Sequence, residues 1–339
     1  GDGTAAAPVK LQGWRTPWKT TASPGSPAQP ATALAGIYTA ALDLADEALK
    51  EQEAYPQGYG SGTLKITTAG AATWTGTLAD GTAVTRGTAV GPGGEVPLHF
   101  MLYTPTAAAT AGSAHGWVRV SPGADAGKLE DNTLDTMLDL TEAQPQDQPM
   151  FDWRKQPQLP AAVTRSYKAG IPLHKLKVTG GGYVKPATGM LVLNLPDEAE
   201  NAKLTFSGAN VETSLTYLNS NRGGPGASMD KKVIRITKTN TLAPFAAGTN
   251  PATITLKINA ATGALSGSFK LVADPDLTDH VAPIATVDRK VNFAGFLVPR
   301  LNTGVGSFQL PQMPTEGPPT TPTTTAPILS GRVILEPSH

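Results

Sequence analysis

One strand-turn-strand segment occurs twice in the chain, and this repeat constrains the fold more than any other feature of the sequence. The copies are TLKITTAGAATWTGTL, from residue 63, and TLKINAATGALSGSFKL, from residue 255. In both copies apolar and polar residues alternate around a short polar turn, and a period of two is typical of β-strands. We expect two related β-hairpins in which Lys65 and Lys257 face away from the neighbouring leucine and isoleucine side chains.

The flanks of the two copies also correspond. LAGIYTAAL (34–42) precedes the first copy and TGMLVLNLP (188–196) precedes the second. VPLHFMLY (96–103) and KVNFAGFLVP (290–299) follow the first and second hairpins. We therefore predict that one module, made of a leading strand, a hairpin and two closing strands, is used twice with different insertions.

The composition favours strands over helices. The chain has 36 Gly and 30 Pro among 339 residues, and both residue types disfavour helix interiors. The best helical stretch is DLADEALKEQEA (43–54), with Asp43 as a capping residue and Pro56 just beyond its end. We predict an all-β fold of two tandem, internally related β-sandwich or barrel-like domains, with extended ordered arms and one short helical insert.

Shifts in composition divide the chain into segments. Residues 1–33 are rich in proline and lack periodicity, so we expect an arm that lies against its own domain or against a neighbouring subunit. The predicted segments are an N-terminal extended arm (1–33), a first β domain (34–148), a Pro-rich basic connector (149–180) and a second β domain (181–339), which includes a Pro/Thr-rich loop (313–327) and the terminal strand SGRVILEP (330–337).

The strand pattern GSGTLKITTAGAATWTGTLADGTAVTRGTAVGPGGEVPLHFMLY resembles a functionally uncharacterised β-rich repeat module found near the C-terminal ends of large secreted bacterial surface proteins. The second half is similar to the closing region of that module, through TGALSGSF, VNFAGFLVP, GVGSF and SGRVILEP. The resemblance covers residues 34–120 and 181–336, and it implies no catalytic residue. The chain departs from the pattern at 43–54 and 313–327, where we expect any specialised role to be located.

Charge and cysteine content exclude several classes of function. The 27 basic and 27 acidic residues cancel, so no overall field attracts nucleic acid. The absence of cysteine excludes disulfide bonds and thiolate metal sites. No run of about 18 apolar residues is present, so we expect no membrane span. The start at Gly1 without an initiator Met suggests export to the exterior of a bacterium, either extracellular or at the cell surface, or a fragment of a longer protein.

No motif in the sequence specifies a reaction. Ser228 and Lys231 match the S-x-x-K pattern but lie in a Gly-rich loop rather than at the start of a helix. The histidines show no ligand spacing along the chain, and we interpret them as solvated or hydrogen-bonded side chains: His99, His115, His174, His280 and His339. We expect no enzymatic activity and no cofactor.

Three carboxylates in ADPDLTD, Asp274, Asp276 and Asp279, form a weak candidate site for Ca²⁺. Their spacing does not match an EF-hand loop, and Pro275 interrupts it. A solvated loop is the alternative interpretation.

Two adjacent segments carry opposite charge. Residues 125–147 contain seven acidic residues and one lysine, whereas residues 154–177 contain six basic residues and no acid. Such patches favour head-to-tail pairing of copies, although neutralisation within one chain is the alternative. The candidate residues for assembly are Trp14, Trp18, Asp131, Asp135, Asp139, Arg154, Lys155, Arg165, Val333 and Leu335.

These features predict a non-catalytic structural protein of the bacterial exterior. We expect a self-assembling subunit of a surface filament or layer, joined to copies of itself through extended arms and β-strand addition. The alternative is a carbohydrate-binding or adhesin-like accessory module that binds surface polysaccharide. In that case sugars would stack on exposed members of the set Trp14, Trp18, Trp117 and Trp153.

Overall fold

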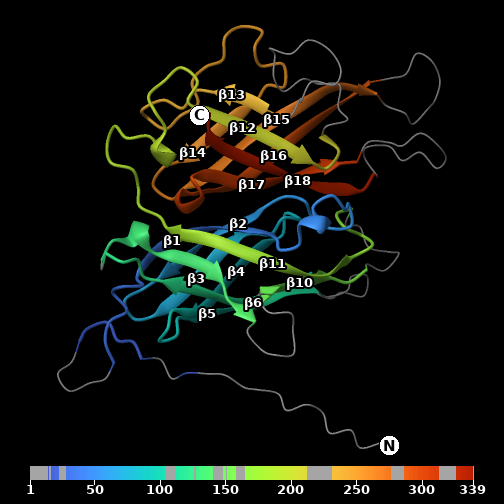
Figure 1. Ribbon diagram of the computed structural model, residues 1–339. Coiled ribbons are helices and arrows are strands. Elements are labelled where there is room, and N and C mark those ends of the chain that lie inside the picture. Colours follow the sequence, from blue (N-terminus) through green and yellow to red (C-terminus); the bar gives the residue numbers. More distant parts are fainter. Residues whose placement is uncertain are drawn as a thin grey trace, which may run out of the picture.

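The chain folds into two antiparallel β-sheets that lie one above the other (Figure 1). The computed structural model describes residues 14, 17–22, 28–103, 112–125, 127–139, 148–149, 151–157, 165–211, 231–275, 286–312 and 326–338. Within these residues the named helices are single 3-10 turns, and no helix has the length and apolar character that a bilayer crossing requires. The predicted all-β class with two β domains is confirmed.

The first sheet has nine strands and curls on itself. Its order is β4-β3-β2-β1-β11, then one strand position that β7 and β10 share, which we call the lane, then β6 and β5. β4 and β5 end this order on opposite sides, yet residues 90–94 join them directly, so the two ends of the sheet come together there. The strands are β1 Gly36–Leu44, β2 Gly60–Ile66, β3 Ala71–Thr77, β4 Ala83–Ala89, β5 Glu95–Leu102, β6 Gly112–Ser121, β7 Thr133–Thr136, β10 Phe151–Lys155 and β11 Ile171–Gly182. The largest side chains buried inside the curl are Tyr38, Trp74, Phe151 and Trp153.

β7 and β10 occupy one lane of this sheet, end to end. β7 pairs with the last residues of β6 and β10 with its first residues, and both also pair with β11. The chain leaves the lane after Thr136, passes through a short ribbon of β8 (Leu138–Asp139) and β9 (Gln148–Pro149), and re-enters the lane at Phe151. The acidic stretch therefore interrupts one strand of the first sheet instead of ending the domain.

The boundary between the sheets lies later than predicted. Residues 149–180, expected to be a connector, supply β10 and β11, and β11 pairs with most of β1. Two of the basic residues that suggested a connector, Lys175 and Lys177, occupy outward positions of β11 between buried neighbours. The first domain thus extends to Gly182.

The second sheet contains seven antiparallel strands in the order β13-β12-β18-β17-β16-β15-β14. The last strand of the chain, β18, lies inside this sheet, paired with β12 on one side and β17 on the other. The strands are β12 Ala202–Gly208, β13 Lys231–Ile234, β14 Thr255–Asn259, β15 Ala264–Pro275, β16 Thr286–Val298, β17 Thr303–Pro311 and β18 Ile328–Pro337.

The position of β18 corrects the prediction that the terminal strand adds to a neighbouring molecule. Both of its edges are already hydrogen-bonded within the chain. Val333 and Leu335, proposed as assembly residues, are 1% and 0% exposed in the second core. Their alternation with exposed or half-buried residues reflects an inward face rather than a docking face.

The repeated TLKI segments form the expected strands in different surroundings. Leu64 and Ile66 on β2, and Leu256 and Ile258 on β14, are buried, and the lysine between each pair is exposed. β2 is an inner strand between β1 and β3, whereas β14 ends the order of the second sheet. The hairpin is therefore repeated, but the order of strands around it is not.

Two predicted elements differ from the structure. The leading strand of the second copy, 188–196, is absent, and a 3-10 turn at Val192–Asn194 takes its place because left-handed backbone at Leu193 interrupts any strand. The helical insert at 43–54 is reduced to a 3-10 turn, Glu47–Leu49, capped by Asp46. Asp43 does not cap it, because β1 continues to Leu44 through its pairing with β2 and β11.

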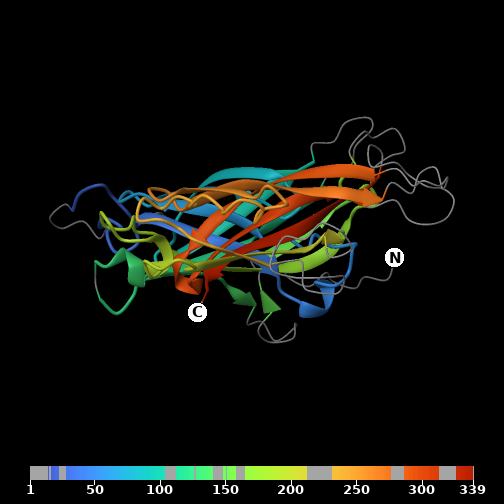
Figure 2. The same cartoon turned by 90° about the horizontal axis from the view of Figure 1, so that it is seen from above.

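The two sheets pack closely, with the strands of the second covering those of the first in the view from above (Figure 2). The contact is made mostly by small side chains and by backbone, with Ala41, Val298 and Val305 forming a small apolar cluster. Ser330 Oγ donates a hydrogen bond to Ala79 O, and Gln309 Nε2 donates to the same oxygen at 2.9 Å. The domains therefore meet through hydrogen bonds and close backbone approaches.

The described part of the arm lies on its own domain. Trp18 packs against the first core, and its indole N–H donates to Val90 O at 2.8 Å. Ala31 N donates to Thr68 O at 2.8 Å, which ties the arm to the turn between β2 and β3. Of the two predicted positions, these residues adopt the intrachain one, and the arm covers the place where the ends of the curled sheet meet.

Candidate functional site

A row of four titratable side chains crosses the outer face of the first sheet. His99 on β5 lies opposite His115 on β6, His115 lies opposite Asp152 on β10, and Asp152 lies opposite Lys175 on β11. Side chains alternate across a strand, so these residues point outward while their sequence neighbours enter the core. In Figure 1, β5 and β6 lie on the side of the first sheet away from the second sheet, and β11 lies nearer to it.

The side chains of the row are close enough to act on one ligand. The imidazole centroids of His99 and His115 are 5.9 Å apart, with their planes at 76°. Lys175 Nζ lies 2.9 Å from Asp152 Oδ1, and both side chains are partly exposed. The row lines a hollow of about 410 Å³, together with Pro97 and Trp117.

Apolar and aromatic side chains border the row on both sides. On one side Trp117, half-buried, packs edge-to-face on Trp14 of the arm, with ring centroids 5.4 Å apart. On the other side lie the two most exposed large apolar side chains of the described residues, Met101 at 81% and Leu173 at 62%. Arg154, an exposed assembly candidate, belongs to this same face and pairs with Ser113 of β6. We refer to this surface as the outer face of β5, β6, β10 and β11.

This arrangement offers binding rather than an evident reaction. Asp152 accepts hydrogen bonds, Lys175 donates them, and each imidazole can do either. The residues that line the hollow include a single carboxylate, whereas hydrolysis of a glycosidic bond normally uses two. Within the described part of the chain, no group of three or more histidines or acids is arranged to hold a metal ion.

The acidic residues predicted to set assembly are only partly available. Asp135 forms an ion pair with Arg300 of the second domain, with Oδ1 and Nη1 2.5 Å apart. Asp131 is exposed, beside the 3-10 turn Leu129–Asp131. Asp139 belongs to β8, and its side chain lies outside the described residues.

The predicted basic residues are used mainly inside the chain. Lys155 is 4% exposed, donates to Ser166 O at 2.6 Å and lies 4.8 Å from the centroid of the Tyr103 ring. Burial lowers the pKa of its ammonium group. Arg165 Nε donates to Ala326 O at 2.8 Å, next to β18. These contacts join the expected connector to both domains and do not present a charged docking patch.

The predicted sugar-binding tryptophans differ in their exposure, and the side chains of the calcium candidates lie outside the described residues. Trp153 is 1% exposed and presents no free ring face, whereas Trp14, Trp18 and Trp117 are half-buried, with Trp18 packed against the first core. Asp274 is part of β15, with its side chain outside the described residues. The other two calcium candidates, Asp276 and Asp279, and the S-x-x-K pair's Ser228 also lie outside them.

A second hollow, of about 380 Å³, lies where the domains join. Tyr183, Met190 and Leu297 line it, and left-handed non-glycine residues, Leu193 and Asn302 among them, form part of its wall. Burial raises the pKa of Tyr183 to about 12. Its wall combines apolar side chains with four polar ones, those of Glu130, Tyr183, Asn194 and Asn302.

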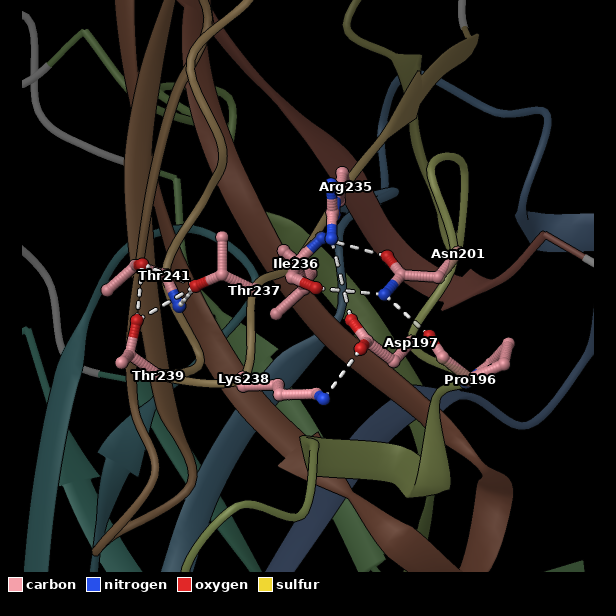
Figure 3. A network of polar contacts seen from close by, with 9 residues as sticks. All are labelled: Pro196, Asp197, Asn201, Arg235, Ile236, Thr237, Lys238, Thr239 and Thr241. Carbon is pink, nitrogen blue, oxygen red and sulfur yellow. Dashed lines mark hydrogen bonds and ion pairs between the residues drawn. The ribbon is translucent and has the colours of Figure 1, made fainter.

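A polar network just beyond this wall in the sequence joins residues 196–201 to residues 235–238 (Figure 3). Asn201 donates to Pro196 O and Ile236 O, both at 2.8 Å, and accepts from Ile236 N at 2.8 Å. Asp197 bridges Arg235 and Lys238 at 3.5 and 2.9 Å. The polar side chains of Asn201 and Asp197 are paired within this network, so they fix the loop rather than offer groups to a ligand.

Sequence reasoning missed most of the row. His99 and His115 were assigned to strands, but their direct pairing follows only from the register of β5 and β6. Asp152 and Lys175 belong to the stretch predicted as a connector. A usable signal exists in the alternation of FDWRK (151–155), which marks Phe151 and Trp153 as inward and Asp152 as outward.

Comparison with known proteins leaves the site as the only guide to function. No protein-family model matches the chain, and the searches of curated proteins and of solved structures found no match either.

Proposed function

We propose that this chain is a non-catalytic carbohydrate-binding module of the bacterial exterior, and that the glycan lies on the outer face of β5, β6, β10 and β11. The observation that carries the proposal is the exposed hydrogen-bonding row from His99 to Lys175 beside the Trp14–Trp117 pair.

The chemistry of the row suits a ligand with many hydroxyl groups. A sugar hydroxyl donates to the Asp152 carboxylate and accepts from the Lys175 ammonium, so the two charges bind it without a net charge on the ligand. The ring of Trp117 offers an apolar surface to the C–H face of a sugar. The shallow, open shape of the hollow suits a stretch of polysaccharide better than a small enclosed ligand.

The arrangement of the chain supports binding over assembly by strand exchange. β18 is paired on both edges, and the described part of the arm is packed on its own domain. The firm contact between the domains would hold the outer face in one orientation relative to the rest of the chain. Location outside the cell follows from the composition and from the resemblance described above, and it is part of the proposal.

The experiment is a glycan array probed with the full chain at neutral pH. Binding to at least one polysaccharide or oligosaccharide supports the proposal. A chain that is folded by circular dichroism but retained by no immobilised glycan contradicts it.

Self-association is a second candidate, favoured by the edge of β4 that faces away from β3. Within the described residues this seven-residue strand is hydrogen-bonded to β3 alone, although it lies close to β5 where the ends of the sheet meet, and four of its residues are exposed. Two copies could join their β4 edges, although Arg86 near the middle of each strand would oppose close antiparallel pairing. Light scattering on a dilution series tests self-association. A chain that is monomeric at all concentrations contradicts it.

A further inference from the structure

His99 and His115 form a directly opposed pair on neighbouring antiparallel strands. Both rings are exposed, and their centroids are 5.9 Å apart. Leu98 and Ala114 beside them are buried, so the strand geometry holds both imidazoles on the outer face. Spacing along the sequence hides this pair, because the two residues are on different strands.

The separation of the rings is close to that of two imidazoles bound to one metal ion. With a metal–nitrogen distance of about 2.0–2.1 Å and tetrahedral angles, the ring centroids lie roughly 5 Å apart. Small rotations of exposed side chains close the remaining difference, and such rotations are fast and cost little. No movement of the backbone is needed.

The neighbours of the pair supply a carboxylate on one side. Asp152 lies next to His115 in the row, and its Oδ1 is at present 2.9 Å from Lys175 Nζ. A carboxylate beside a ligating histidine can receive the second ring N–H and so orient the ring. The charged residue facing the pair across the row is Lys175, whose charge Asp152 offsets.

We propose that His99 and His115 chelate one divalent transition-metal ion that favours imidazole, such as Zn²⁺ or Ni²⁺, with Asp152 as the adjacent carboxylate. Two imidazoles leave further coordination positions open, and water or an external ligand fills them. The bound ion joins β5, the end strand of the first sheet, to β6. This inference does not rest on the glycan proposal, because the ion alone serves as the probe.

The test is isothermal titration of the metal-free full chain with Zn²⁺, repeated with Ni²⁺. The variants are His99→Gln, His115→Gln and the double substitution, with Lys65→Gln, an exposed residue of β2 outside the outer face, as the control. A chelate requires both rings, so each single variant loses at least about tenfold in affinity and as much as the double variant. The control keeps the affinity of the unmodified chain.

Two results overturn the proposal: a double variant that binds the ion as tightly as the unmodified chain, or single variants with separate partial losses that add up in the double variant. Melting curves provide an independent measurement. Because an ion that binds only the folded chain stabilises it, Zn²⁺ raises the melting temperature of the unmodified chain and not that of the double variant. Equal melting temperatures without metal show that the exposed substitutions leave the fold intact.

Discussion

Gly58 of the first domain lies directly against Gly331 of the second. A Cβ atom at Gly58 would be 2.5 Å from the Gly331 carbonyl oxygen and 2.7 Å from Ser330 Oγ. The Gly58 N–H also donates a hydrogen bond to Ser330 Oγ at 3.2 Å. The two domains thus touch backbone to backbone, and no side chain larger than hydrogen fits at this point.

Substitution of Gly58 by alanine should therefore weaken the contact between the domains. We expect a loss of about 1–3 kcal/mol in the free energy of unfolding, because overpacked sites force neighbouring groups apart. Urea denaturation measures the loss. The control is Gly87→Ala, where a Cβ would meet nothing within 4 Å, and it should be neutral or slightly stabilising. Equal stability of the two variants would contradict the close contact.

Deletion of residues 1–30 should destabilise the first domain. The deletion removes Trp18 from the first core and leaves Val90 O without its indole donor. Trp18→Ala alone should lower the free energy of unfolding by about 1–3 kcal/mol, through lost burial and a lost hydrogen bond. Thermal melting provides the measurement. An unchanged melting temperature after both changes would show that the arm does not stabilise its own domain.

Acid should destabilise the chain through His174. This residue is 5% exposed, lies against Tyr55 and Trp153, and has Nδ1 2.8 Å from Pro172 O. Burial lowers its pKa, in opposition to the Pro172 carbonyl and the Asp152 carboxylate.

The sign follows from proton linkage. The unfolded chain binds a proton at this histidine near pH 6.5 and the folded chain only at lower pH, so stability is present above about pH 6.5 and falls as the pH drops below it. Denaturant midpoints between pH 7.5 and 5 measure the effect. His174→Gln should flatten this dependence, whereas exposed His99→Gln should retain it. If His174→Gln keeps the full slope, another group is responsible.

Tyr103→Phe should destabilise the first core. The Tyr103 hydroxyl donates to Asp80 Oδ2 at 2.6 Å and accepts from Trp153 Nε1 at 3.2 Å. The phenylalanine ring fills the same space but leaves the buried Trp153 N–H without this partner. A loss of about 1–3 kcal/mol in unfolding free energy is expected. Chemical denaturation that shows no loss would mean that water replaces the hydroxyl.

The sequence predicted the parts of the fold that depend on local patterns. The alternation of Leu64 with Ile66, and of Leu256 with Ile258, correctly indicated buried strand faces with exposed lysines between them. A period of two along a short segment determines the inward face but says nothing of the strand's neighbours. That is why two nearly identical hairpins occupy an inner position in one sheet and an end position in the other.

The candidate site depends on pairing between distant segments and was largely beyond prediction. Asp152 meets His115 because the lane of β7 is interrupted and resumed by β10, an arrangement with no local signature. Trp117 and Trp14 could be proposed as sugar-binding residues by type alone, but their mutual contact could not. Val333 was misassigned for the converse reason, since an inward strand face resembles a docking face in sequence.

The most direct test of the account is the affinity of matched variants for a glycan that the full chain binds. Affinity electrophoresis in gels containing that polysaccharide compares Trp117→Ala with Arg86→Ala, an exposed residue of β4 outside the outer face. The account predicts a loss of about tenfold for Trp117→Ala, equivalent to about 1.4 kcal/mol, and no loss for Arg86→Ala. Equal retention of the two variants would contradict the assignment of the glycan to the outer face of β5, β6, β10 and β11.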